Sequence, residues 1–210
     1  LTMTNFHHAR SGMFQPITLG TEFYLNSKRN LQVGGMLFLA GCLLVAGMFA
    51  LGLFWFKTSD LFGLAFFFFC ISYCLWIVSS SYYVIPSLFA NWPWIVTLRL
   101  EYISLALAIT FYGYFIKTVL ENKVRWWPFH VSASASVLFM AITAIAPSGI
   151  STMLFPYYIA FVSGAYFILV LSSIKLVNFS HKLTWINLTG SLALLLVIAL
   201  RVLSSNGHIN

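Results

Sequence analysis

The chain has 210 residues, of which 60% are hydrophobic and only 7% are charged, and its mean hydropathy is +0.91. This composition excludes a soluble globular protein, because six apolar spans of about 20 residues account for nearly all of the hydrophobic positions. The formal net charge of +7 then indicates the basic cytoplasmic loops of a membrane protein, with the lipid bilayer as its surroundings and no nucleic-acid partner.

Residues 1–30 form the only extended polar stretch, and Gly12, Pro16 and Gly20 interrupt it. Its short apolar runs predict one or two strands rather than a helix. We therefore expect a short extended segment that lies outside the membrane. Since the chain begins at Leu1 without an initiator Met and has no signal-peptide pattern, we also expect it to be a fragment of a longer protein.

The rest of the sequence predicts an all-α integral membrane protein, with a transmembrane helical domain over residues 31–204 and an outer loop remnant at 205–210. The connection at 57–60 is so short that the first two helices must form a tight hairpin, with Ser59 or Asp60 capping the second. The predicted bundle of six transmembrane helices has spans at 31–56, 61–80, 95–117, 127–146, 156–177 and 185–204.

Basic residues fall on alternate connections between the predicted helices, and positive charge marks the cytoplasmic side of a membrane. The connections at 81–94 and 147–155 contain no charged residue. The opposite set carries six basic residues, namely Lys57, Lys117, Lys123, Arg125, Lys175 and Lys182. Because these outweigh Lys28 and Arg29, we expect a multi-pass protein of the inner (plasma) membrane with its N-terminus on the extracytoplasmic side.

Only three ionisable side chains lie well inside the predicted spans: Arg99, Glu101 and Arg201, all toward the outer ends. Charge in hydrocarbon needs a partner or a route to water. We expect Glu101 and Arg201 to form an interhelical ion pair, and Arg99 to be an interfacial charge that extends to the outer headgroups. The alternative, in which each of the three reaches interfacial water separately, stays open.

Catalysis needs a positioned nucleophile, base or metal, and the sequence contains no G-x-S-x-G, no H-E-x-x-H and no Gly-rich phosphate loop. We therefore expect no catalytic residue, no cofactor-binding or metal site, and no enzyme activity. Cys42, Cys70 and Cys74 lie within apolar runs, and we expect them to be buried free thiols.

Two further features concern helix packing. In the first predicted helix Gly35, Gly41, Gly47 and Gly52 permit close approach of a neighbouring helix. All six prolines are expected in loops or at helix ends, so the spans lack the broken helices in which transporters commonly bind their substrates.

A small integral-membrane transporter or channel subunit remains the alternative function. It requires a neutral polar path through the bilayer, and the residues that can line one are Thr110, Ser134, Ser163 and Tyr166.

Several stretches of the sequence are distinctive: N-F-H-H-A-R-S-G and P-I-T-L-G within 5–20, G-G-M-L-F-L-A-G at 34–41, K-T-S-D at 57–60, and L-R-L-E-Y at 98–102. In this order they resemble the bacterial seven-transmembrane receptors with diverse intracellular signalling modules (7TMR-DISM). The similarity covers nearly the whole chain.

The resemblance implies a sensor in which an extracytoplasmic jelly-roll domain precedes the membrane region and a kinase, cyclic-nucleotide enzyme or phosphatase follows it. Residues 1–30 are then the end of that outer domain. The sequence departs from the family pattern in lacking most of the outer domain, the seventh helix and any effector. We expect a signal-transducing region that relays ligand binding outside the cell to the effector of the same longer chain, with a homodimer as an arrangement suggested by analogy.

Overall fold

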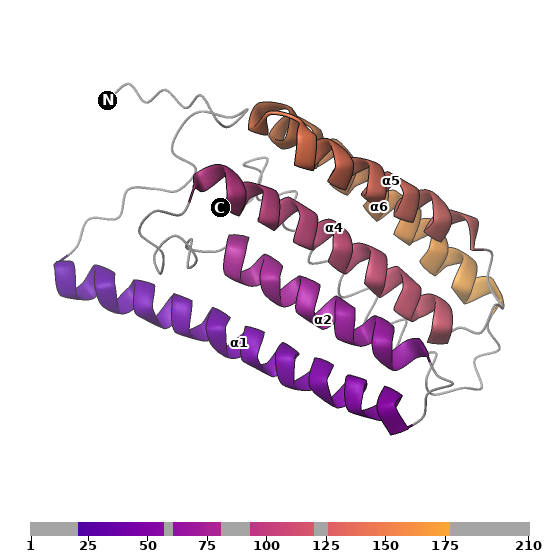
Figure 1. Cartoon of the computed structure of the whole chain (residues 1–210), viewed down its shortest axis with the longest axis horizontal. Helices are drawn as coiled ribbons and strands as arrows, with labels where there is room; N and C mark the ends of the chain where they lie inside the picture. Colours follow the sequence, from indigo (N-terminus) through magenta and orange to yellow (C-terminus); the bar gives the residue numbers. More distant parts are fainter. Residues whose placement is uncertain (1–20, 57–60, 81–92, 120–125, 177–210) are drawn as a thin grey trace.

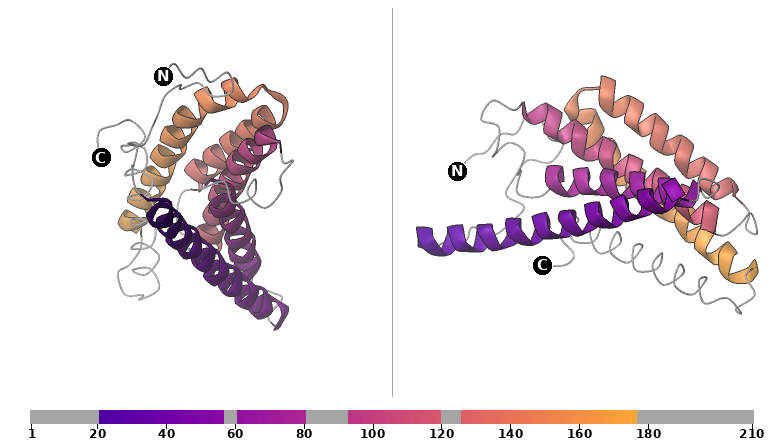
Figure 2. Two further views of the ribbon diagram at one scale, coloured as in Figure 1. Left: turned by 90° about the vertical axis from the view of Figure 1, so that its left-hand side faces the viewer. Right: turned by 60° about the horizontal axis from the view of Figure 1, so that its bottom comes forward.

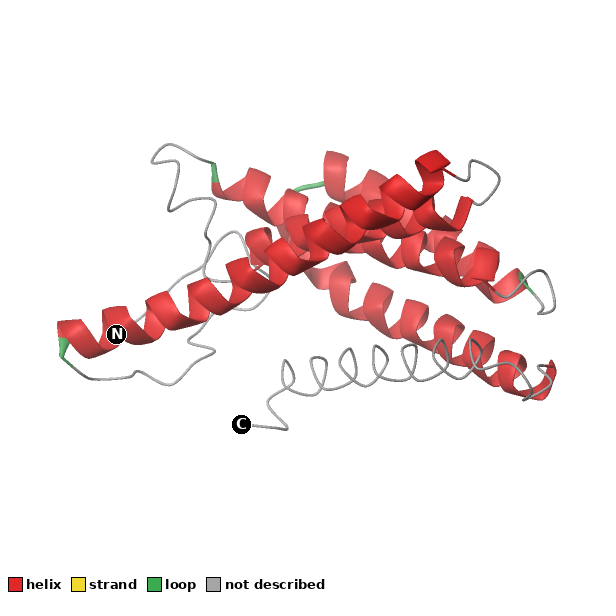
Figure 3. Ribbon diagram, turned by 90° about the horizontal axis from the view of Figure 1, so that it is seen from below, coloured by secondary structure: helices red, strands yellow, loops and turns green. Residues whose placement is uncertain are grey.

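The computed structural model describes residues 21–56, 61–80, 93–119 and 126–176. In Figure 3 every element of this part is a helix, and no strand occurs among these residues. The helices are α1 (Glu22–Phe56), α2 (Leu61–Ser80), α4 (Trp94–Val119), α5 (Trp127–Ile145) and α6 (Ser148–Leu176). All five are long and apolar enough to cross a membrane, so the prediction of an all-α membrane protein is confirmed for the described residues.

The contacts between helices follow a simple order. α1 packs against α2, α2 against α4, and α4 against both α5 and α6, which also pack on each other. Figures 1 and 2 show α1 at the edge of this arrangement, on the far side of α2 from α4. Of the described helices, α4 is therefore the central one and α1 is peripheral.

Three of the predicted helices have nearly the observed bounds. α2 covers Leu61–Ser80, the predicted residues, while α4 and α5 differ from prediction by one or two residues at an end. Pro128 lies in the first turn of α5, where its missing N–H costs no helical hydrogen bond. The predicted helix at 185–204, the loop at 205–210 and the capping residues Ser59 and Asp60 lie outside the described residues.

The predicted start of the first helix at residue 31 is wrong. α1 begins at Glu22, and the Leu25 N–H donates a hydrogen bond to the Thr21 carbonyl at 3.0 Å. No Gly or Pro occurs between Gly20 and Gly34, so the helix continues through polar residues that hydropathy does not mark. The prediction of extended structure is therefore wrong for residues 22–30, whereas the strands expected within residues 1–20 lie outside the described part.

The predicted start of the helix at 156 is also wrong, because α6 begins at Ser148 and Pro156 lies inside it. The Pro147 carbonyl accepts hydrogen bonds from the N–H groups of Ile150 and Ser151 at 3.1 and 3.5 Å, which starts the helix directly after α5. Residues 148–155 are uncharged and contain no Pro, so they continue the span. The expectation that every proline lies in a loop or at a helix end therefore fails at Pro156, which removes one hydrogen bond from the helix.

Aromatic rings make up much of the interface between α2 and α4. Three phenylalanines of α2 each lie beside an aromatic side chain of α4, with ring centroids 5.1–5.3 Å apart. The pairs are Phe66–Phe115, Phe68–Phe111 and Phe69–Tyr112. Such pairs stabilise packing by about 0.5–1.5 kcal/mol each beyond area burial, so α2 and α4 are firmly joined.

The cysteine predictions are partly confirmed. Cys70 and Cys74 are buried and Cys42 is exposed, and all three are free thiols. The expectation of burial is wrong for Cys42 because it lies on the side of α1 that faces away from α2, whereas Ala40 and Gly47 on the other side are buried.

Candidate functional site in the core of α4, α5 and α6

The largest buried cluster joins α4 to α5 and α6. On α4 it extends from Leu98 to Ile116, a length of about 27 Å at 1.5 Å per residue. This is close to the thickness of the hydrocarbon core of a bilayer, about 30 Å. Its other buried members are Tyr102, Ala106, Phe129, Phe139, Tyr158, Ile159, Val162, Tyr166 and Leu169. The cluster therefore joins the three helices over a length of α4 close to that of the hydrocarbon core.

Arg99 lies at the end of the cluster where α5 ends and α6 begins. Its Nη2 donates a hydrogen bond of 3.4 Å to the carbonyl of Ala146, the C-terminal cap of α5. The Arg99 Nε, Thr97 Oγ1 and Ser151 Oγ are buried and have no hydrogen-bond partner within the described part of the chain. The sequence, which predicted contact with headgroups, gave no sign of the Ala146 contact.

Glu101 lies half-buried on α4, and its backbone carbonyl accepts a hydrogen bond of 3.1 Å from the Ser104 hydroxyl. Arg201 lies outside the described residues. The predicted ion pair between the two therefore stays a prediction.

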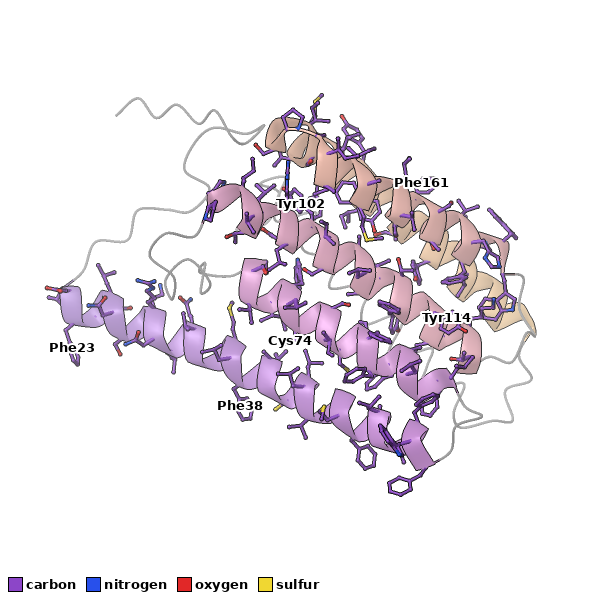
Figure 4. The ribbon with its side chains drawn as sticks, in the orientation of Figure 1. Phe23, Phe38, Cys74, Tyr102, Tyr114 and Phe161 are labelled. Carbon is purple, nitrogen blue, oxygen red and sulfur yellow. The ribbon has the colours of Figure 1, made fainter. Side chains whose placement is uncertain are left out.

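Two aromatic stacks lie on either side of Pro156 in α6. Phe155 stacks on Tyr102 of α4, with ring centroids 4.6 Å apart, and Figure 4 shows Tyr102 between α4 and the α5–α6 pair. Tyr158 stacks on Phe139 of α5 at 4.3 Å. Thus α6 contacts α4 just before its proline and α5 just after it.

A buried hydrogen bond between side chains reinforces the second of these contacts. The hydroxyls of Tyr158 and Ser136 are 2.9 Å apart, and Ser136 also donates to the Ser132 carbonyl within α5. A buried polar pair of this kind favours one relative position of α5 and α6, because a shift leaves hydroxyls unsatisfied.

Side chains of α5 and α6 come very close to the backbone of α4 at Gly113. A Cβ atom at this position would lie 2.7 Å from Cδ2 of Phe129 on α5 and even closer to the hydroxyl of Tyr166 on α6. Tyr166 is buried, and its hydroxyl donates a hydrogen bond of 2.6 Å to the Ile109 carbonyl. Only glycine fits here, so Gly113 lets α4, α5 and α6 meet.

Three of the four residues proposed to line a polar path donate hydrogen bonds to backbone carbonyls. Thr110 donates to the Ala106 carbonyl of its own helix at 2.8 Å, and Ser134 is exposed on α5 and donates to the Val131 carbonyl at 2.9 Å. Tyr166 donates to Ile109 across α4 and α6, and Ser163 lies half-buried on α6. The hydroxyls of Thr110, Ser134 and Tyr166 are therefore each used in a bond to the backbone.

The chemistry available at this site is packing and hydrogen bonding. Among the described residues, no group of three or more His, Cys, Asp or Glu side chains is placed to hold a metal ion. The sequence analysis placed Tyr166 in a possible polar path and did not single out Gly113. The one available signal was a glycine in the middle of a helix, which costs about 1 kcal/mol relative to alanine and so suggests a packing requirement.

The chain matches the family described as 7TM diverse intracellular signalling over residues 35–210. No curated protein and no solved structure matches it. The matched region begins within α1 and contains α2, α4, α5 and α6 entirely, and this confirms the resemblance that the sequence motifs indicated. The chain therefore belongs to the 7TM diverse intracellular signalling family and is a membrane region of a signalling receptor.

Proposed function

We propose that the chain relays an extracytoplasmic binding event through the inner membrane of a bacterium to a cytoplasmic effector of the same longer protein. The observation that carries the proposal is the buried cluster from Leu98 to Ile116 of α4, which joins α4 to α5 and α6 over about 27 Å, close to the thickness of the hydrocarbon core. Helices joined in this way can pass a shift at one membrane face to the other, since closely packed interfaces change between discrete arrangements. The chain itself performs no catalysis in this proposal.

The transporter or channel alternative has less support. Thr110 and Ser134 bond to the backbone of their own helices, and no Asp, Glu, Lys, Arg or His residue lies near the middle of the predicted spans. Uptake of small neutral solutes by proteoliposomes that contain the chain, at a rate above that of empty liposomes, would favour it.

The relay can be tested with Tyr166→Phe in the full-length receptor. The substitution keeps the buried ring but removes the hydrogen bond to Ile109, worth about 1 kcal/mol. We expect the midpoint of the ligand response of the effector to shift about fivefold, the factor that corresponds to this energy. The measurement is effector output against ligand concentration at matched membrane expression.

Tyr157→Phe is the matched control, because Tyr157 is on the same helix but 68% exposed. We expect it to leave the midpoint unchanged, and residues 1–210 alone to show no kinase, cyclase or phosphatase turnover. Equal midpoints for Tyr166→Phe and the unmodified receptor would contradict a relay through this contact.

The proposed orientation gives a second test, by cysteine labelling of intact cells in a background without Cys42, Cys70 and Cys74. Ile150→Cys should react with an impermeant maleimide from outside, whereas Lys123→Cys should react only after the membrane is opened. Ile150 is the better outer probe because it is 49% exposed, whereas Ser151 is 1% exposed. The reverse labelling pattern would show that the positive-inside rule assigns the wrong side here.

A further inference from the structure

Two buried hydrogen-bond donors near the start of α6 have no partner in the described part of the chain. They are the Nε of Arg99 on α4 and the hydroxyl of Ser151 on α6. Ser151 is only 1% exposed. Buried polar groups are normally paired, because an unpaired group gives up its hydration for nothing. A bound group that accepts hydrogen bonds would satisfy both donors.

Arg99 and Ser151 lie at the same level of two helices that run in the same direction. α4 and α6 are in contact where Tyr102 stacks on Phe155, and again further along both helices at the hydrogen bond of Tyr166. Arg99 and Ser151 each precede the stacked pair by about one helical turn. The register therefore places the two unpaired donors at the same end of the contact between α4 and α6.

The guanidinium of Arg99 is held where α5 ends and α6 begins. Its Nη2 donates to the carbonyl of Ala146 at 3.4 Å, and α6 starts two residues later at Ser148. A guanidinium has five N–H donors, so this contact with the end of α5 leaves others available. Arg99 thus lies beside the first turn of α6 with donors to spare.

The first turn of α6 supplies further donors. The N–H groups of Ile150 and Ser151 bond to the Pro147 carbonyl, whereas those of Ser148 and Gly149 have no acceptor within the helix, as at any helix N-terminus. Side chains on a helix tilt toward its N-terminus, so the Ser151 hydroxyl points toward this turn. A Cβ atom at Gly149 would meet nothing within 4 Å, which leaves the turn open to an incoming group.

The positive charge at this place has no carboxylate to balance it among the described helices that surround it. The guanidinium is cationic, and aligned peptide dipoles give the start of α6 a partial positive charge. α2, α5 and α6 contain no Asp or Glu. The one acidic residue of α4, Glu101, is turned about 200° around the helix from Arg99. The place therefore favours an acceptor that is negatively charged.

We propose that Arg99, Ser151 and the first turn of α6 form a binding site for a phosphate group. Phosphate oxygens can accept from a planar guanidinium, a hydroxyl and the N–H groups of a helix N-terminus at the same time. Arg99 is next to Leu98, at one end of the buried cluster on α4, so the group is carried either by a lipid headgroup or by free phosphate. When bound, it joins α4 to α6 at this end of the core. The site does not depend on the proposed relay.

Binding can be measured with the Cys42→Ser chain in dodecyl maltoside, a detergent without phosphate. A ligand that binds only the folded chain raises its unfolding temperature, which the reactivity of the buried thiols of Cys70 and Cys74 reports. We expect a saturable rise with inorganic phosphate or with short-chain phosphatidylglycerol. Sodium chloride at matched ionic strength, and a short-chain diacylglycerol without phosphate, should give no saturable rise.

Variants locate the site. Ser151→Ala removes one hydrogen bond and no charge, and we expect it to weaken binding of the phosphate probe about fivefold. Arg99→Gln should weaken it by more than tenfold. The controls should bind as the unmodified chain does: Thr97→Val removes another buried, unpaired hydroxyl, about 200° around α4 from Arg99, and Lys117→Gln removes a charge in the last turn of the same helix.

The two probes distinguish the sources of the phosphate group. Saturation by phosphatidylglycerol alone assigns the site to a lipid headgroup, whereas saturation by inorganic phosphate, with or without the lipid, assigns it to a phosphate group that reaches it from solution. No saturation by either probe, or an equal effect of sodium chloride, would overturn the proposal. Unchanged binding in Ser151→Ala or Arg99→Gln, or an equal loss in Lys117→Gln, would overturn it as well.

Discussion

Replacing Gly113 by leucine is expected to destabilise the described bundle by about 1–3 kcal/mol or more, the range for overpacking a close-packed core. The cause is steric, because even a Cβ atom at this position would lie 2.7 Å from the Phe129 ring and closer still to the Tyr166 hydroxyl. To make room, α5 or α6 must move away from α4. We therefore expect loss of the hydrogen bond between Tyr166 and Ile109 together with the close packing.

Thermal unfolding in detergent, followed by thiol reactivity, measures this effect. In a Cys42→Ser chain the remaining thiols, Cys70 and Cys74, are buried and react when the bundle opens. Gly164→Leu is the matched control, since it also adds a leucine to a helical glycine but has open space around its Cβ. Equal unfolding temperatures for the Gly113 and Gly164 variants would contradict the close approach at Gly113.

A double variant separates steric overlap from general loss of helix packing. Gly113→Ala adds the atom that meets the Tyr166 hydroxyl, and Tyr166→Phe removes that hydroxyl. We therefore expect Tyr166→Phe to cost less stability in the Gly113→Ala background than in the unmodified chain. Residues in contact show such non-additive effects, commonly of about 0.5–3 kcal/mol.

Hydropathy predicted the described helices well where a helix end coincides with a change in polarity. α2 is an example, since Leu61–Ser80 is apolar throughout. The predicted starts of α1 and α6 are wrong for different reasons. Glu22 begins a polar extension of α1, and the expectation that prolines lie at helix ends places the start of α6 at Pro156 although the helix begins at Ser148. Helical hydrogen bonding, rather than hydropathy, decides these boundaries, and the sequence shows it only through the absence or presence of Gly and Pro.

The contacts of the core were much less predictable. Gly113 and Tyr166 lie far apart in the sequence. The spacing of apolar residues along a helix cannot show which helices become neighbours, because every face of these helices is apolar. Nor did the sequence indicate that Arg99 contacts Ala146. Glycines on α1 illustrate the same limit, because Gly47 lies against Cys70 whereas Gly41 meets nothing, although both were expected to permit close helix contact.

The charges near the outer ends of the spans give the last prediction, an ion pair between Glu101 of α4 and Arg201. Glu101 is half-buried, and its neighbour Tyr102 is buried in the core, so a charge at 101 is partly removed from water. Removing one partner of a buried pair costs about 3–5 kcal/mol, because the other charge is left uncompensated. We therefore expect Glu101→Gln and Arg201→Gln each to lower the unfolding temperature strongly.

Exchange of the two residues distinguishes a pair from two separately solvated charges. If the carboxylate and guanidinium are paired, the double variant Glu101→Arg with Arg201→Glu restores an opposite-charge contact and should recover part of the lost stability, so the single effects are not additive. If instead each side chain reaches interfacial water alone, each single replacement costs less than about 0.5 kcal/mol and the double variant shows their sum. An experimental structure with the Glu101 carboxylate more than about 6 Å from the Arg201 guanidinium, and no water between them, would remove the basis for the pair.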